Sequence, residues 1–217
     1  MEEFKPDLNN AQPKPEESSQ VNERPISPED FFSTKIETYR LTKDNFYKLI
    51  KQRNPEMDDD KIWQAKGVNM EMNGKVIILL RTDKYPEQYM PYLETHEKWE
   101  AYIARKNGFN LWDRSVRRYK EDKEIDSLEG DKLKEFFKEL EVYNYDFRHE
   151  YAIYKEYQQA LSDGRLEEYH KWFMELRETE KSGSSEANLK LIENDTNIRE
   201  SIYKKLTEGG THIFTRN

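Results

Sequence analysis

Two of the four histidines in this chain are followed directly by a glutamate, His96-Glu97 and His149-Glu150. A second glutamate, Glu100, lies four residues after His96. On a helix, residues four apart project from one face with Cβ atoms about 5–6 Å apart, which is close enough to share a metal ion. Glu97 would then be placed to reach a water held by that metal. The spacing therefore suggests metal-assisted chemistry at this segment.

A metal site of this kind needs a further ligand from elsewhere in the chain. The helix expected from about Asp146 to Ala160 can supply one, and His149 is the first choice. Glu150 and Glu156 are alternatives, and Glu156 shares a helical face with His149 because the two are seven residues apart. The candidate metal ligands are therefore His96, Glu100 and His149.

The segment from Val68 to Lys106 resembles the core of the zincin-type metallopeptidases, whose helical motif is His-Glu-x-x-His. It contains a β-hairpin, a short loop and a helix that carries His-Glu-x-x. The resemblance implies that His96 is the first metal ligand and Glu97 the general base. It also implies zinc as the metal, which would lower the pKa of a bound water toward ~7 and polarise a scissile carbonyl. The implied activity is that of a metal-dependent hydrolase acting on peptides.

The chain departs from that family at Glu100, which occupies the place of the second histidine in the motif. A carboxylate can bind zinc at about 2.0–2.2 Å, so a site of His96, Glu100 and His149 remains consistent with zinc. Two histidines and one carboxylate also match the ligand set of non-haem iron enzymes. Iron or another divalent metal is therefore an open alternative.

A different interpretation needs no metal. Glutamate is common in this chain, so His96 and Glu100 could be an i,i+4 pair worth a few tenths of a kcal/mol beside a packing face of Trp99, Tyr102 and Ile103. The protein would then be a non-enzymatic helical module that docks a protein partner through a tyrosine-rich surface. This alternative predicts an exposed aromatic patch and histidines that do not meet.

Hydrophobic periodicity predicts the elements that would hold these side chains. Alternating residues around Asn73-Gly74 predict a β-hairpin at 68–80, because Asn-Gly favours the type I′ turn. A helix is expected after Thr42 and another from about Glu87 to Lys106. Apolar stripes then predict helices near 133–140, 147–161 and 166–176, with a break at Asp163-Gly164. The expected fold class is α+β and predominantly α, with one β-hairpin packed against about five to six helices.

Composition divides the chain into three regions. Residues 1–28 are rich in Pro, Glu, Asn, Ser and Gln and predict a disordered tail, because they can bury little apolar surface. Residues 29–180 form the expected helical domain. Residues 181–217 predict a flexible link, a polar helix and a loose end. Of the other histidines, His170 is expected at the boundary of the core and His212 in solvent.

Charge and residue usage limit the classes of partner. The net charge of −8 argues against nucleic acid, since phosphate binding relies on clustered Lys and Arg. There is no cysteine, so a metal would have to use His, Asp or Glu. The sequence shows neither a signal pattern nor an apolar run of about 20 residues, which predicts a cytoplasmic protein without a membrane segment. A protein or peptide remains the expected partner.

Overall fold

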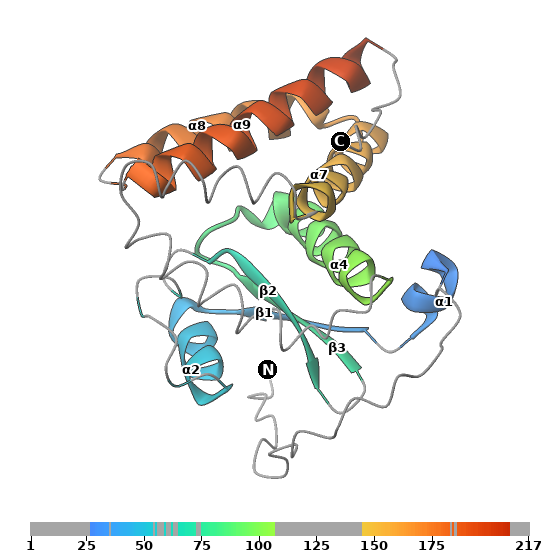
Figure 1. Ribbon diagram of the computed structural model, residues 1–217, viewed down its shortest axis with the longest axis vertical. Coiled ribbons are helices and arrows are strands. Elements are labelled where there is room, and N and C mark those ends of the chain that lie inside the picture. The colour runs from blue at the N-terminus through green and yellow to red at the C-terminus, as the bar shows by residue number, and fades with distance from the viewer. Residues whose placement is uncertain are drawn as a thin grey trace.

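The computed structural model shows an α+β protein that is predominantly α (Figure 1), as the sequence predicts. Among the residues that it describes are six α-helices, one short 3₁₀ helix and a three-stranded sheet. The described residues are 27–34, 36–53, 55, 59, 62, 65–72, 75–106, 145–182, 184 and 186–208.

The sheet consists of β1 (Ile36–Leu41), β2 (Gly67–Met72) and β3 (Lys75–Arg81), in the order β1-β3-β2. β2 and β3 are antiparallel, with Met72 opposite Lys75, so the predicted hairpin is confirmed. Its Asn-Gly turn lies outside the described residues. The sequence analysis did not anticipate β1, which pairs in parallel with the central strand β3.

The central strand is covered on both faces because helices pack on each side of the sheet. Successive side chains of β3 point to opposite faces. α2 (Lys43–Arg53) covers one face, where Phe46 and Ile50 are buried against Ile77 and Leu79. The other face carries Val76, Ile78 and Leu80, which belong to the larger core beneath the remaining helices.

The larger core is formed by helices that cross one another above the sheet (Figure 1). The 3₁₀ helix η1 (Glu87–Tyr89) leads directly into α4 (Met90–Lys106), which confirms the helix predicted from about Glu87 to Lys106. α4 packs on β2 and β3, and α7 (Tyr145–Ser162) packs along α4. α4 therefore lies between the sheet and α7.

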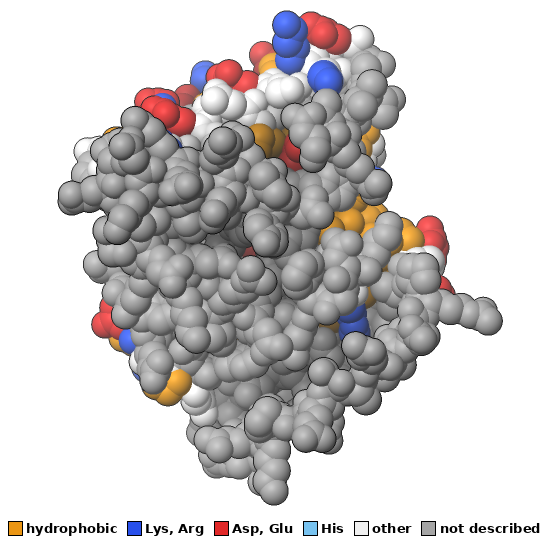
Figure 2. All heavy atoms as spheres, viewed as in Figure 1, with side chains coloured by type: hydrophobic (Ala, Val, Ile, Leu, Met, Phe, Trp, Pro, Cys, Tyr) orange, Lys and Arg blue, Asp and Glu red, His pale blue; other side chains and the backbone are white. Residues whose placement is uncertain are grey.

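α8 (Leu166–Lys181) and α9 (Glu186–Thr207) form a pair of helices that packs on α7. The predicted break between α7 and α8 is present, and Gly164 has a φ of +69°, a left-handed conformation that favours glycine. The outward side of this pair is charged, as Figure 2 shows along the end of the molecule formed by α8 and α9. Its inward side carries the completely buried Ile202 of α9 together with the buried ionic residues Asp195 and Arg199.

Near its N-terminal end the described chain begins with α1 (Pro28–Ser33), capped by the side chain of Ser27. Phe31 is fully buried and its ring lies 5.5 Å from that of Tyr102 on α4. This contact attaches the first helix to the same core.

Several predicted features lie outside the described residues. They are residues 1–26 of the tail predicted at 1–28, the helix near 133–140 and the loose end at 209–217, whereas Ser27 caps α1 and Pro28 begins it. None of the helices in the described ranges combines the length and the apolar composition required to cross a bilayer.

We predict that Ile202→Ala destabilises the protein, because Ile202 is the fully buried anchor of α9. Loss of a buried isoleucine side chain costs about 2–5 kcal/mol. Urea unfolding followed by circular dichroism measures the change. Leu161→Ala is the control, since Leu161 is 45% exposed and its loss should cost less than about 0.5 kcal/mol. Equal unfolding midpoints for the two variants would contradict the packing of α9.

Candidate metal centre

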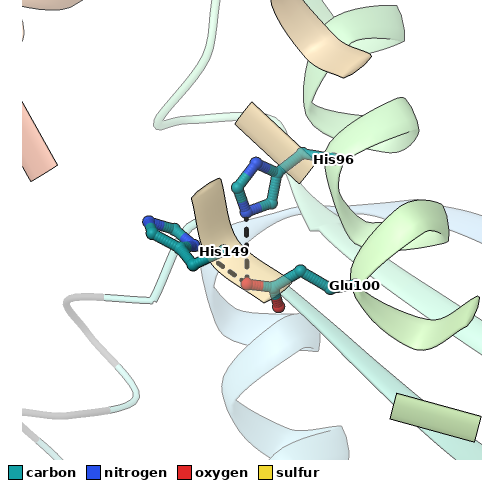
Figure 3. Close-up of side chains that lie close together, drawn as sticks. All are labelled: His96, Glu100 and His149. Atoms are coloured by element: carbon teal, nitrogen blue, oxygen red, sulfur yellow. Dashed lines mark hydrogen bonds and ion pairs between the residues drawn. The ribbon is translucent and has the colours of Figure 1, made fainter. Parts of the chain in front are cut away.

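α4 and α7 bring the three predicted metal ligands together. One ligand atom from each of His96, Glu100 and His149 lies within 4.8 Å of the others, so the group could hold a metal ion. His96 and Glu100 project from one face of α4, and His149 approaches them from α7 (Figure 3). His96 and Glu100 are buried, whereas the His149 side chain is 27% exposed.

One oxygen of Glu100 is the point on which both histidines converge. Oε1 of Glu100 lies 3.4 Å from Nε2 of His96 and 2.9 Å from Nδ1 of His149 (Figure 3). The two imidazole rings are 4.8 Å apart between centroids and nearly perpendicular, at 76°. The rings are therefore close neighbours, each with one nitrogen directed at the same carboxylate.

The other nitrogen of each ring meets a buried carboxylate. Nδ1 of His96 lies 2.8 Å from Oε2 of Glu156 on α7, and Nε2 of His149 lies 2.8 Å from Oδ1 of Asp195 on α9. Glu156 and Asp195 are themselves 1% and 6% exposed. Each histidine is thus held between two acidic groups, and its ring cannot rotate without losing a hydrogen bond.

Arg199 of α9 neutralises both outer carboxylates. Its guanidinium donates to Glu156 at 2.7 and 3.3 Å and to Oδ2 of Asp195 at 3.2 Å. Arg177 of α8 also donates a hydrogen bond to Asp195, and the hydroxyl group of Tyr169 donates one to Glu156. The buried acidic groups around the histidines therefore have cationic or hydrogen-bonding partners from both α8 and α9.

These contacts change the pKa values of the buried groups in opposite directions. Burial by itself lowers the pKa of His96, but the hydrogen bonds and charges of Glu100 and Glu156 outweigh it and raise the pKa to about 10. Burial by itself raises the pKa of Glu156, but Arg199 and His96 outweigh it and lower the pKa to about 2. The two neighbouring carboxylates therefore favour the protonated form of His96.

Glu97 points in another direction from His96, because successive residues on a helix are about 100° apart. Its carboxylate faces β2, where Nδ2 of Asn69 donates to Oε2 at 2.7 Å. A Cβ atom at Gly67 would lie 2.6 Å from Oε1 of Glu97, so the absence of a side chain there makes room for this carboxylate. The predicted general base is therefore buried between α4 and the sheet, and it does not belong to the group formed by His96, Glu100 and His149.

The alternative ligands take other places. Glu156 is hydrogen-bonded to Nδ1 of His96, the ring nitrogen that faces away from Glu100. Among the described residues, the group that could hold a metal does not include Glu150. Sequence analysis did not identify Asp195 and Arg199, because their i,i+4 spacing on a predicted polar helix is that of an ordinary surface ion pair. Their role depends on burial, which the spacing does not reveal.

The remaining described histidine, His170, lies at the boundary of the core and away from the group. Its ring stacks on Tyr203 with centroids 4.0 Å apart, and its Nδ1 lies 3.1 Å from the Tyr157 hydroxyl. It is partly exposed, in agreement with the boundary position expected for it. His212 lies outside the described residues.

Tyr151, Tyr154 and Tyr157 of α7 belong to the tyrosine-rich surface that the docking interpretation requires. Tyr154 is 8% exposed and Tyr157 is completely buried, while Tyr151 is partly buried against the larger core. These rings pack inside the helical layer, and the histidines His96 and His149 do meet. No described observation favours the docking interpretation.

Comparison of the chain with protein-family models, with curated proteins and with solved structures found no match. The class of protein is therefore defined by fold and site alone. It is an α+β protein in which two crossing helices form a buried group of two histidines and one glutamate that could hold a metal ion.

We predict that His170 makes the protein less stable as the pH falls from about 6.5 to 4. Burial and the charge of Arg199 lower the pKa of His170 to about 4 in the folded protein, compared with about 6.5 in an unfolded chain. Between these values the unfolded chain binds a proton that the folded protein does not, so acidification favours unfolding. The stabilising effect of neutral His170 is fully present above pH 6.5.

Urea unfolding of wild type and His170→Gln at pH 7.5 and pH 5 measures this contribution. Wild type should lose more stability between the two pH values than the variant, whose side chain does not titrate. Equal losses would show that His170 has an ordinary pKa in the folded protein.

Proposed function

We propose that the protein binds a divalent transition metal through His96, Glu100 and His149, with zinc as the first candidate. We further propose that it is a zincin-like hydrolase of peptides. The observation that supports the proposal is the convergence of these three side chains. His149 and Glu100 are 49 residues apart in the sequence, yet their nitrogen and oxygen are 2.9 Å apart in a largely buried position. If His96 and Glu100 were an ordinary surface pair on α4, we would not expect a histidine from α7 to lie in contact with them.

The distances in the group fit an ion of this size. Ligand atoms about 2.1 Å from a tetrahedral ion are about 3.4 Å from one another. Nε2 of His96 and Oε1 of Glu100 have this separation, 3.4 Å. Nδ1 of His149 is closer to the same oxygen, at 2.9 Å, and the whole group lies within 4.8 Å. To share one ion, the ligand atoms would have to move so that the 2.9 Å separation lengthens and the separations of up to 4.8 Å shorten to about 3.4 Å.

The donor atoms favour a transition metal over calcium or magnesium. Two imidazole nitrogens and one carboxylate suit zinc and iron(II), whereas calcium and magnesium prefer oxygen ligands. Three protein ligands also leave one coordination position for water or substrate, as in catalytic zinc sites. The partial exposure of His149, 27%, gives that position a side from which solvent can approach.

A bound zinc ion would supply Lewis-acid chemistry, activation of a water and polarisation of a substrate carbonyl. The chain would contribute the orientation of the ligands and a group that accepts a proton. Glu97 is the proposed general base, because it follows the ligand His96 directly and is kept buried by Asn69 and the space at Gly67. Its carboxylate would have to turn from Asn69 toward the group to act.

We predict that the purified wild-type protein binds close to one zinc ion per chain. His96→Ala and His149→Ala should each weaken zinc binding by more than about 100-fold, because loss of a supporting partner alone already costs 10–100-fold. Elemental analysis gives the metal content, and titration against a competing chelator gives the affinity. Magnesium and calcium in large excess should not displace the zinc.

His170→Gln is the matched control, since it removes a histidine that lies outside the group. This variant should bind zinc as wild type does. A wild-type protein that takes up neither zinc, cobalt nor iron(II), or a His96→Ala variant with unchanged affinity, would exclude the proposed site.

We predict further that Glu97→Gln retains the metal and loses hydrolysis. Glutamine can still accept the hydrogen bond from Asn69 but cannot take up a proton, and general-base catalysis contributes about 10²–10⁴-fold in rate. Cleavage of a quenched-fluorescent peptide library by zinc-loaded wild type and variant measures the difference. Wild-type protein that is loaded with zinc and cleaves nothing would overturn the hydrolase assignment, and equal rates would remove Glu97 from its role.

A further inference from the structure

The two histidines of the candidate metal centre present different ring nitrogens to Glu100. His96 faces it with Nε2, and His149 faces it with Nδ1. The nitrogens turned away are Nδ1 of His96 and Nε2 of His149, which lie 2.8 Å from Glu156 and Asp195 respectively. The site is therefore asymmetric although both ligands are histidines.

The outer contacts determine which nitrogen carries the hydrogen. A neutral imidazole has one N–H donor and one nitrogen with a free lone pair, whereas an ionised carboxylate can only accept. With a metal between the two rings and Glu100, each outer carboxylate faces the N–H, which leaves the lone pair of each ring on the inner nitrogen that faces the metal. Only a nitrogen with a free lone pair can bind a metal.

α9 controls both outer carboxylates. Asp195 contacts His149 directly, and Arg199, four residues later on the same helix, donates to both oxygens of Glu156. Arg199 also donates to the oxygen of Asp195 that is turned away from His149. A guanidinium cannot accept a hydrogen bond, so it fixes both carboxylates as acceptors in one orientation.

We propose that His96 binds the metal through Nε2 and His149 through Nδ1, and that Glu156 and Asp195, organised by Arg199, are the positioning residues that impose this difference. The inference rests on the proposed metal site and adds how its ligands are presented. It assigns a function in metal binding to α9, which contributes no ligand to the group.

NMR of the wild-type protein tests the inference without any substitution. The protein is labelled with nitrogen isotope in its histidine rings and loaded with an NMR-active cadmium isotope, which binds the same kind of nitrogen ligand as zinc. The cadmium nucleus should couple to Nε2 of His96 and to Nδ1 of His149, and each outer nitrogen should carry a hydrogen. Coupling to the same type of nitrogen in both rings would overturn the inference.

Asp195→Asn tests the positioning role. Arg177 and Arg199 require an acceptor, so the amide oxygen should turn to them and the amide NH₂ to His149. Nε2 of His149 would then accept, its hydrogen would move to Nδ1, and the metal would lose that ligand. Metal affinity should fall by more than about 100-fold, as for His149→Ala, and the coupling to Nδ1 of His149 should disappear while that to His96 persists.

Glu200→Gln is the control, because it makes the same change of charge on an exposed position of α9. It should match wild type in affinity and in both couplings. Equal affinity and equal couplings in Asp195→Asn would overturn the inference while leaving the metal site in place. A wild-type protein that binds no metal would instead exclude the proposed function and this inference with it.

Discussion

The arrangement of the site depends on one buried guanidinium. Arg199 is 2% exposed, and its Cζ lies 3.5 Å from the centroid of the Phe173 ring, so it has left water almost completely. Burial of a charge is costly unless it is paired and hydrogen-bonded, and Arg199 meets this condition with Glu156 and Asp195. Removal of any one of the three would leave an uncompensated charge inside the helical layer.

The same pairing connects the site to the rest of the molecule. Asp195 also forms an ion pair with Arg177, and Arg177 forms a second ion pair with Glu180. Glu180 in turn pairs with Lys66 beside the sheet at 2.9 Å. Burial and the charge of Arg177 lower the pKa of Lys66 to about 8, although Glu180 opposes the change. A continuous series of charged contacts therefore runs from the edge of the sheet through α8 and α9 to the histidines. The proposed metal binding and the docking of α9 would stabilise each other, because the candidate ligands converge only in the folded arrangement.

The opposite directions of His96 and Glu97 follow from the pitch of α4. One residue of advance turns the side chain by about 100°, so His96 faces α7 while Glu97 faces β2. The helix thus places a candidate metal ligand and an acidic group on neighbouring sides of one turn. With no match to known proteins, the functional proposal rests on this geometry and on the chemistry of the donors.

Local patterns in the sequence were enough to predict the hairpin, α4, the break at Gly164 and the pairing of His96 with Glu100, because each depends on spacing within about ten residues. His149 could be proposed as a third ligand from its residue type, but only the packing of α7 on α4 brought it to Glu100. β1 was missed because its residues are mostly half-buried and show no clear alternation. Asp195 and Arg199 were missed because an ion pair four residues apart looks the same in solvent and in a core. Their burial, and with it the orientation of both histidines, is a property of the tertiary structure, where distant helices exclude water from charges that the sequence alone leaves in solvent.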